Sequence, residues 1–151
     1  MAAGLRIRPA EERDLDAMER IEVAVFASDR ASRRQLRHAV RAPTILCLAA
    51  ERGGALAGYA IIELRRGSRV ARLASIAVAP EASGRGLGRE LLTAVEAAAR
   101  ARGCDRVRLE VRADNAPAQR LYDRTGYARF SQEADYYEDG ASAWRYEKAL
   151  A

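Results

Sequence analysis

The chain has 151 residues, of which 49% are apolar, and this length suits a single domain over residues 1–151 that buries about two-thirds of its unfolded surface. No run approaches the 18 consecutive apolar residues of a membrane-spanning helix, and the first residues lack the apolar segment of a secretory signal. Composition therefore predicts a soluble, cytoplasmic protein with no membrane partner.

The net charge of +5 comes from arginine, since Lys148 is the only lysine among 26 basic residues. We attribute this bias mainly to a GC-rich genome and give less weight to selection for RNA binding, although the charge can attract a polyanionic ligand. Cys47 and Cys104 have no metal or redox spacing and are expected in the core. His38 is the only histidine. Catalysis by serine–histidine or cysteine–histidine pairs is therefore poorly supported, and no metal site is predicted.

One strand and two helices are predicted in the first third of the chain. Residues 5–10 alternate apolar and polar side chains, which is typical of a short strand. Apolar residues then recur at helical spacing from residue 11 to about residue 26. A second helix is predicted from Ser32, a favourable N-cap, to about Arg41, before Pro43.

The rest of the chain alternates strands and helices. Three β-rich runs separated by the turn signals RGG and RGS predict an antiparallel meander, at residues 44–51, 55–66 and 69–80. The remaining predicted elements are, in chain order, a helix at 86–102, a strand at 105–112, a helix at 114–126, and strands at 127–130 and 143–150 around an acidic loop. We therefore predict an α/β (α+β) fold with a central mixed, mostly antiparallel sheet of about seven strands, flanked by about four helices.

The stretch SGRGLGRELL, residues 83–92, has three glycines before a helix-prone run. A P-loop needs a Lys-Ser/Thr pair after its last glycine, but Arg89 and Glu90 stand there. The dinucleotide fingerprint G-x-G-x-x-G also fails, because its third position falls on Arg89. A pyrophosphate-binding turn of another kind remains, since unpaired N–H groups at a helix N-terminus suit an anion. The alternative is a glycine-rich turn that only leads into a surface helix.

The order of elements and four motifs resemble the GCN5-related N-acetyltransferase (GNAT) family over essentially the whole chain. The motifs are LRIRPAEERDLDAM, ASIAVAPEASGRGLGRELL, LEVRADNAPAQRLYDRTGY and DYYEDGASAWRYEKAL. The acetyl-CoA turn of the family has the pattern Arg/Gln-x-x-Gly-x-Gly/Ala. Its end matches Gly86-Leu87-Gly88, whereas its first position falls on Ser83. The chain looks most like the RimI type, which acetylates the α-amine of protein N-termini, such as that of a ribosomal protein.

The resemblance implies that acetyl-CoA is the cosubstrate and assigns a role to each site residue. The strand backbone of Ile76, Ala77 and Val78 would pair with the pantetheine arm of the cosubstrate. The pyrophosphate would be held by the turn that contains Gly84, Arg85, Gly86, Leu87, Gly88 and Arg89. The side-chain amide of Asn115 would hydrogen-bond the cosubstrate near its reacting end. Glu110 in LEVR matches the general base of the RimI type. Tyr122 in RLYDRTGY matches its general acid.

These residue types suit amine acetylation, which needs no metal. An amine attacks a thioester only in its neutral form, and a carboxylate can remove its proton directly or through a water. A free strand N–H can stabilise the oxyanion, and a phenol can protonate the departing thiolate. Structural alternatives stay open. Glu110 can point outward and pair with Arg108 or Arg112, Tyr122 can be a core residue, and Asn115 can cap its helix.

The acceptor site implied by the resemblance lies between the first two helices and the acidic loop, residues 131–142. The carboxylates of this loop either attract a cationic amine or basic peptide, or are simply solvated. The leading hypothesis is acetylation of a protein or peptide N-terminus, and the alternative is acetylation of a small amine. A third hypothesis is a non-catalytic protein that binds acyl-CoA or nucleic acid, although no zinc-finger or RNP1 pattern supports nucleic-acid binding. The oligomeric state is not specified, and a homodimer stays open.

Overall fold

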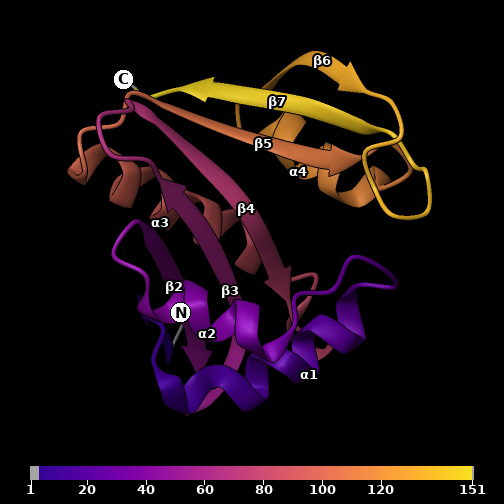
Figure 1. Ribbon diagram of the computed structural model, residues 1–151. Coiled ribbons are helices and arrows are strands. Elements are labelled where there is room, and N and C mark those ends of the chain that lie inside the picture. Colours follow the sequence, from indigo (N-terminus) through magenta and orange to yellow (C-terminus); the bar gives the residue numbers. More distant parts are fainter. Residues whose placement is uncertain (1–3, 151) are drawn as a thin grey trace.

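The computed structural model describes residues 4–150, which form one seven-stranded sheet and four α-helices (Figure 1). The strands are β1 Leu5–Pro9, β2 Ile45–Arg52, β3 Ala55–Leu64, β4 Val70–Val78, β5 Arg106–Arg112, β6 Ala128–Glu133 and β7 Ala143–Ala149. The helices are α1 Leu15–Val25, α2 Arg33–Arg41, α3 Leu87–Ala101 and α4 Ala116–Arg124, with short 3-10 turns at η1 Glu12–Asp14 and η2 Pro80–Ala82.

The predicted order of elements and the mixed sheet are confirmed. The strand order is β1-β2-β3-β4-β5-β7-β6, and only the β4–β5 pair is parallel. The Ser32 side chain caps α2 by accepting from the Gln35 N–H. The last two strands differ from the prediction in one respect. β6 continues to Glu133 because it keeps pairing with β7 as far as Ala143.

Helices cover both faces of the sheet (Figure 1). One layer consists of α1 and α2, which pack over β2, β3 and β4, and α3 packs against the opposite face. Both layers are filled with large side chains that are at most 5% exposed, among them Leu15, Met18, Ile21, Leu36, Leu87, Leu91, Leu92 and Val95. Within residues 4–150, no helix is long and apolar enough to cross a membrane.

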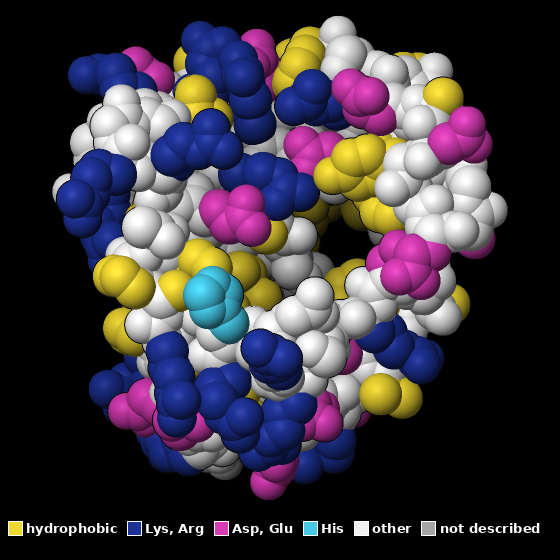
Figure 2. All heavy atoms as spheres, viewed as in Figure 1, with side chains coloured by type: hydrophobic (Ala, Val, Ile, Leu, Met, Phe, Trp, Pro, Cys, Tyr) yellow, Lys and Arg dark blue, Asp and Glu magenta, His cyan; other side chains and the backbone are white. Residues whose placement is uncertain are grey.

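The two parallel strands separate partway along their length. β4 pairs with β5 only from Val70 to Leu73, opposite Arg106 to Leu109. At that point a register shift between Ile61 and Ile62 of β3 marks a bulge in β4. Beyond the bulge β4 still pairs with β3 on one side, while its other side diverges from β5 (Figure 1). The sheet therefore opens into a V, and Figure 2, in the same view, shows an opening in the molecular surface there.

Candidate active site

The glycine-rich turn lies at the N-terminus of α3. Gly84 and Gly86 have φ angles of +79° and +76°, in the left-handed region that favours glycine. No side chain caps the helix, because Gly86 is its N-cap residue. The first N–H groups of a helix have no intrahelical acceptor, so this turn offers backbone donors and a partial positive charge to an anion. Arg85 and Arg89 are exposed on either side of it.

Gly88 lies where three elements meet. A Cβ atom at this position would stand 3.5 Å from Leu121 of α4 and 4.0 Å from Val78 of β4. The turn, the end of β4 and the second half of α4 therefore converge on one site. Leu87 is only 1% exposed, so its side chain belongs to the core and only its backbone can face a ligand.

Ser83, which replaces the long donor of the family pattern, serves the local fold. Its hydroxyl donates to the Pro80 carbonyl at 2.8 Å and closes the η2 turn. The exposed Arg85, two residues further on, is the nearest guanidinium within the turn.

The second half of β4 presents an open backbone edge. Ile76, Ala77 and Val78 pair with β3 through Ala60, Tyr59 and Gly58, respectively. No pairing with β5 extends past Leu73 within the described residues. Ala77 is 2% exposed, while Ile76 and Val78 are half-buried, so this segment can offer its backbone edge to an extended ligand. Sequence reasoning missed Gly58, where a Cβ would stand 2.7 Å from the Ala77 carbonyl oxygen.

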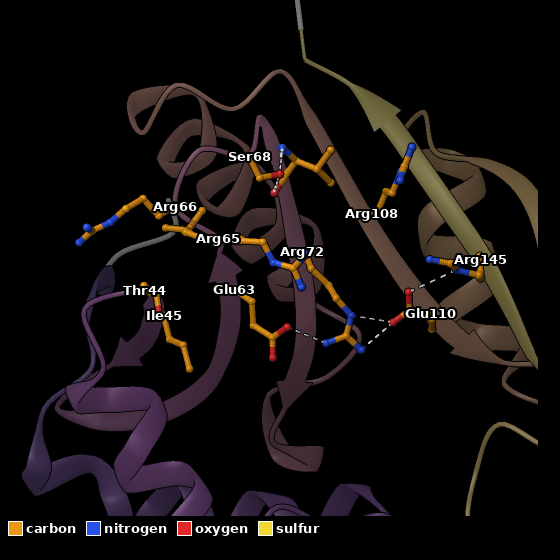
Figure 3. A pocket seen from close by; sticks show the side chains of 12 residues that line it. Thr44, Ile45, Glu63, Arg65, Arg66, Ser68, Arg72, Arg108, Glu110 and Arg145 are labelled. Carbon is orange, nitrogen blue, oxygen red and sulfur yellow. Dashed lines mark hydrogen bonds and ion pairs between the residues drawn. The ribbon is translucent and has the colours of Figure 1, made fainter.

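Glu110 lies on β5 just past the last residue paired with β4, and its side chain is 7% exposed. Arg72 donates to Glu110 Oε1 from Nη2 at 2.7 Å and from Nε at 2.9 Å (Figure 3). Arg145 Nε stands 3.6 Å from Glu110 Oε2, and the Tyr136 hydroxyl donates to Oε1 at 3.3 Å. The structural alternative weighed for Glu110 named the wrong partners. Within β5, Arg108 instead donates to Glu147.

Tyr122 is buried, with 4% of its surface exposed. Its ring centroid lies 5.7 Å from that of Tyr127 and 5.8 Å from that of Tyr146. Within residues 4–150 its hydroxyl makes no hydrogen bond, although those of Tyr59 and Tyr127 do. Burial raises the pKa of the Tyr122 hydroxyl, so the group stays protonated at neutral pH. The ring thus belongs to the core, while the proton is available to a ligand.

Glu110 and Tyr122 lie on opposite faces of the sheet. Glu110 is paired with Arg145 of β7, and the two side chains meet on one face. Leu109 is paired with Tyr146, and both are buried on the other face, where Tyr122 packs against Tyr146. A carboxylate and a phenol thus flank the same V from its two sides.

Asn115 is the N-cap of α4, and its Oδ1 accepts from the Ala118 N–H at 3.2 Å. This is the capping role expected from the sequence, and its side-chain amide nitrogen makes no hydrogen bond to residues 4–150. The helix start therefore leaves one amide donor free near the V.

The loop between β6 and β7 is tied to the loop between α1 and α2. Arg112, at the end of β5, pairs with Asp139 at 2.6 Å and lies over the ring of Tyr137 at 5.0 Å. The Glu138 N–H donates to Asp29 at 3.2 Å. Asp139 is thus already neutralised by an arginine. Sequence reasoning missed this contact because its partners are far apart along the chain.

The fold places this chain among the N-acetyltransferases. The model of the Acetyltransferase (GNAT) family matches residues 10–127, so the chain belongs to this family. The family uses acetyl-CoA, and the residues present fit it: two left-handed glycines at an uncapped helix start for a pyrophosphate, and an unpaired strand edge for an extended arm. Within residues 4–150 no cluster of potential metal ligands occurs.

The relatives include N-terminal and small-molecule acetyltransferases. The chain is 31% identical over 95% of its length to the N-terminal acetyltransferase A complex catalytic subunit NAA10 of Arabidopsis thaliana, covering 77% of that protein. It is 34% identical over 90% of its length to mycothiol acetyltransferase of Clavibacter michiganensis, of which it spans only 46%. Its structure superposes on the ribosomal-protein-S18-alanine N-acetyltransferase of Escherichia coli with a TM-score of 0.87 and 29% identity, over 97% of this chain and 94% of that one.

Proposed function

We propose that this enzyme acetylates the α-amine of a protein or peptide N-terminus, with Glu110 as general base and Tyr122 as general acid. The observation that carries the proposal is the placement of a carboxylate and a free phenol on the two sides of the V between β4 and β5. The similarity to NAA10 and to the S18-alanine enzyme supports the choice of acceptor.

Acetyl-CoA supplies an activated acetyl thioester. The backbone donors from Gly84 to Arg89 bind its pyrophosphate, with Arg85 and Arg89 adding charge-assisted contacts. The free edge of Ile76 to Val78 pairs with the pantetheine arm and offers an N–H to the developing oxyanion. The free amide of Asn115 donates to the same arm.

The acceptor enters from the face of the sheet on which the Glu110 side chain lies. Glu110 takes the proton of the ammonium group, directly or through one water, and releases the neutral amine for attack. Tyr122 gives its proton to the thiolate as CoA leaves. Burial raises the pKa of the neighbouring Tyr137 hydroxyl to about 12, so this group also stays protonated at neutral pH.

A small amine is the second candidate acceptor. The mycothiol acetyltransferase match, and a 36% identity over 59% of this chain to streptothricin acetyltransferase of Streptomyces lavendulae, favour it. A free amine on a peptide and one on a small molecule need the same proton removal, so Glu110 serves either.

A thiol-release assay with acetyl-CoA and a panel of N-terminal peptides and small amines tests the proposal. Peptides are expected to be the better acceptors. Glu110→Gln should lower kcat by about 100- to 10,000-fold, with the deficit greatest at low pH, where the amine is most protonated. Equal rates for Glu110→Gln and wild type from pH 6 to pH 9 would remove Glu110 as the base. Failure of calorimetry to detect acetyl-CoA binding would overturn the placement of the cosubstrate.

A further inference from the structure

A pocket of about 530 Å³ lies beside Glu110 on the acceptor side of the sheet (Figure 3). Its walls come from the start of β2, the β3–β4 hairpin, β5 and β7. Side chains at alternate positions of β4 and β5 point into it, while the residues between them are buried against the other face. The lining of the pocket is basic, because it contains five arginines and two carboxylates: Arg65, Arg66, Arg72, Arg108 and Arg145, with Glu63 and Glu110.

Two of these arginines make close hydrogen-bonded ion pairs with carboxylates. Arg72 bridges Glu63 and Glu110, at 2.9 Å and 2.7 Å. Arg108 donates to Glu147 of β7 at 3.0 Å.

Arg145 is held more loosely. Its Nη1 stands 3.6 Å from Glu133, and its Nε stands 3.6 Å from Glu110. Its guanidinium also lies 5.4 Å from the ring centroid of Phe130. A guanidinium held at these distances can turn toward a ligand.

Two arginines remain uncommitted. Arg65 and Arg66 are exposed on the β3–β4 turn, and within residues 4–150 neither forms an ion pair. The pocket therefore keeps an excess of positive charge at its outer wall.

This charge restricts the acceptors that can reach Glu110. A purely cationic amine is repelled by the uncommitted Arg65 and Arg66 at the outer wall. An acceptor that also carries an anionic group meets favourable charge at the outer wall, and a planar carboxylate matches the guanidinium fork.

We propose that this pocket selects amine acceptors that carry a carboxylate near the reacting amine. In a peptide acceptor the carboxylate is an acidic side chain directly after the N-terminal residue. In a small acceptor it is the acid group of an amino acid. The proposal rests on the acetyl transfer proposed above, because the pocket opens beside the base of that reaction.

Three peptides that differ only at the second residue test the selectivity, with Ala-Asp, Ala-Asn and Ala-Lys at their N-termini. Wild type is expected to show a kcat/KM about 10- to 100-fold higher for the Asp peptide than for the Asn peptide, and the lowest value for the Lys peptide. Free alanine against alaninamide gives the same comparison for a small acceptor, because the two differ only in the acid group beside the amine, and it distinguishes the two sources. Equal kcat/KM for the acidic and neutral acceptors in both series, or a preference for Lys, would overturn the proposal and leave the acetyl transfer intact.

The double variant Arg65→Gln/Arg66→Gln tests the residues. It should reduce the Asp-to-Asn ratio by about 10-fold and leave kcat/KM for the Asn peptide within about 2-fold. Arg100→Gln/Arg102→Gln, at two exposed arginines at the end of α3, removes two charges on the other face of the sheet as a matched control and should leave the ratio unchanged. An unchanged Asp-to-Asn ratio in the double variant would contradict the assignment of the selectivity to Arg65 and Arg66.

A binding measurement separates the two proposals. The Asp peptide, labelled at its C-terminus, is titrated with wild type and with the double variant, and fluorescence anisotropy is read. Suppose that no acceptor is acetylated, but the Asp peptide binds and the double variant weakens its binding about 10-fold. This result would support the proposed selectivity of the pocket and contradict the proposed acetyl transfer. Absence of binding of the Asp peptide to wild type would overturn the proposal that this pocket selects acidic acceptors.

Discussion

Replacing Tyr122 by Phe separates its chemical role from its structural one. The substitution removes a hydroxyl that makes no hydrogen bond within residues 4–150 and keeps the ring contacts with Tyr127 and Tyr146. The free energy of unfolding should therefore stay within about 0.5 kcal/mol of wild type. If the hydroxyl protonates the leaving thiolate, kcat should fall about 100- to 10,000-fold, which corresponds to about 2.7–5.4 kcal/mol.

Tyr127→Phe is the matched control. The Tyr127 hydroxyl donates to the buried carboxylate of Glu96 at 3.0 Å, and Lys148 also contacts that carboxylate, at 3.1 Å. Removing this donor should cost about 1–3 kcal/mol of stability and change kcat by less than about 2-fold. The structure thus predicts opposite outcomes for two neighbouring tyrosines.

Urea denaturation and the thiol-release assay, with acetyl-CoA varied, give both quantities for each variant. The KM for acetyl-CoA should change little in Tyr122→Phe, because the phenol acts only when the thiolate departs. If the kcat of Tyr122→Phe is no lower than that of Tyr127→Phe, Tyr122 is a core residue with no role as general acid. A loss of stability equal to that of Tyr127→Phe would mean that its hydroxyl has a structural partner.

Two further predictions concern the cosubstrate turn and the core. Ser83→Arg restores the long donor of the family pattern and should lower the KM for acetyl-CoA about 10-fold. Ser83→Ala should change this KM by less than about 2-fold. Equal KM values for wild type and both variants would contradict the prediction. Burial raises the pKa of the Cys47 thiol to about 12, so its contribution to stability is complete below about pH 9 and declines as the pH rises toward 12. In urea denaturation, wild type should therefore lose about 1 kcal/mol more than Cys47→Ala between pH 9 and pH 10, and parallel losses would refute it.

Local signals predicted most of the elements correctly. Helical spacing of apolar residues predicted α1 and α3, and the caps at Ser32 and Asn115 are made as expected. The sharp turn before α3 was predictable because closely spaced glycines permit positive φ angles, as Gly84 and Gly86 show. These features depend on residues within a few positions of one another, so sequence patterns contain them.

The environment of Glu110 could not be predicted in the same way. Its partner Arg72 lies 38 residues earlier and Arg145 lies 35 residues later, on strands brought together by a parallel and an antiparallel pairing. Which side chains share a face depends on register, and the bulge in β4 alters the register locally. A sequence pattern that favours a strand does not specify which strands become neighbours.

The ion pair between Glu110 and Arg72 bears on both proposals. A carboxylate that accepts two bonds from Arg72 in the free enzyme has fewer lone pairs for an ammonium proton. An acceptor carboxylate that binds the neighbouring guanidinium groups competes with Glu110 for them and releases it to act as a base. A cationic acceptor has no such means of releasing Glu110. Arg65 and Arg66 attract the acidic acceptor, whereas Arg72 and Arg145 hold the base. An acceptor carboxylate that reaches the second pair therefore raises kcat as well as lowering KM, which is the reason to measure the Asp-to-Asn ratio in both.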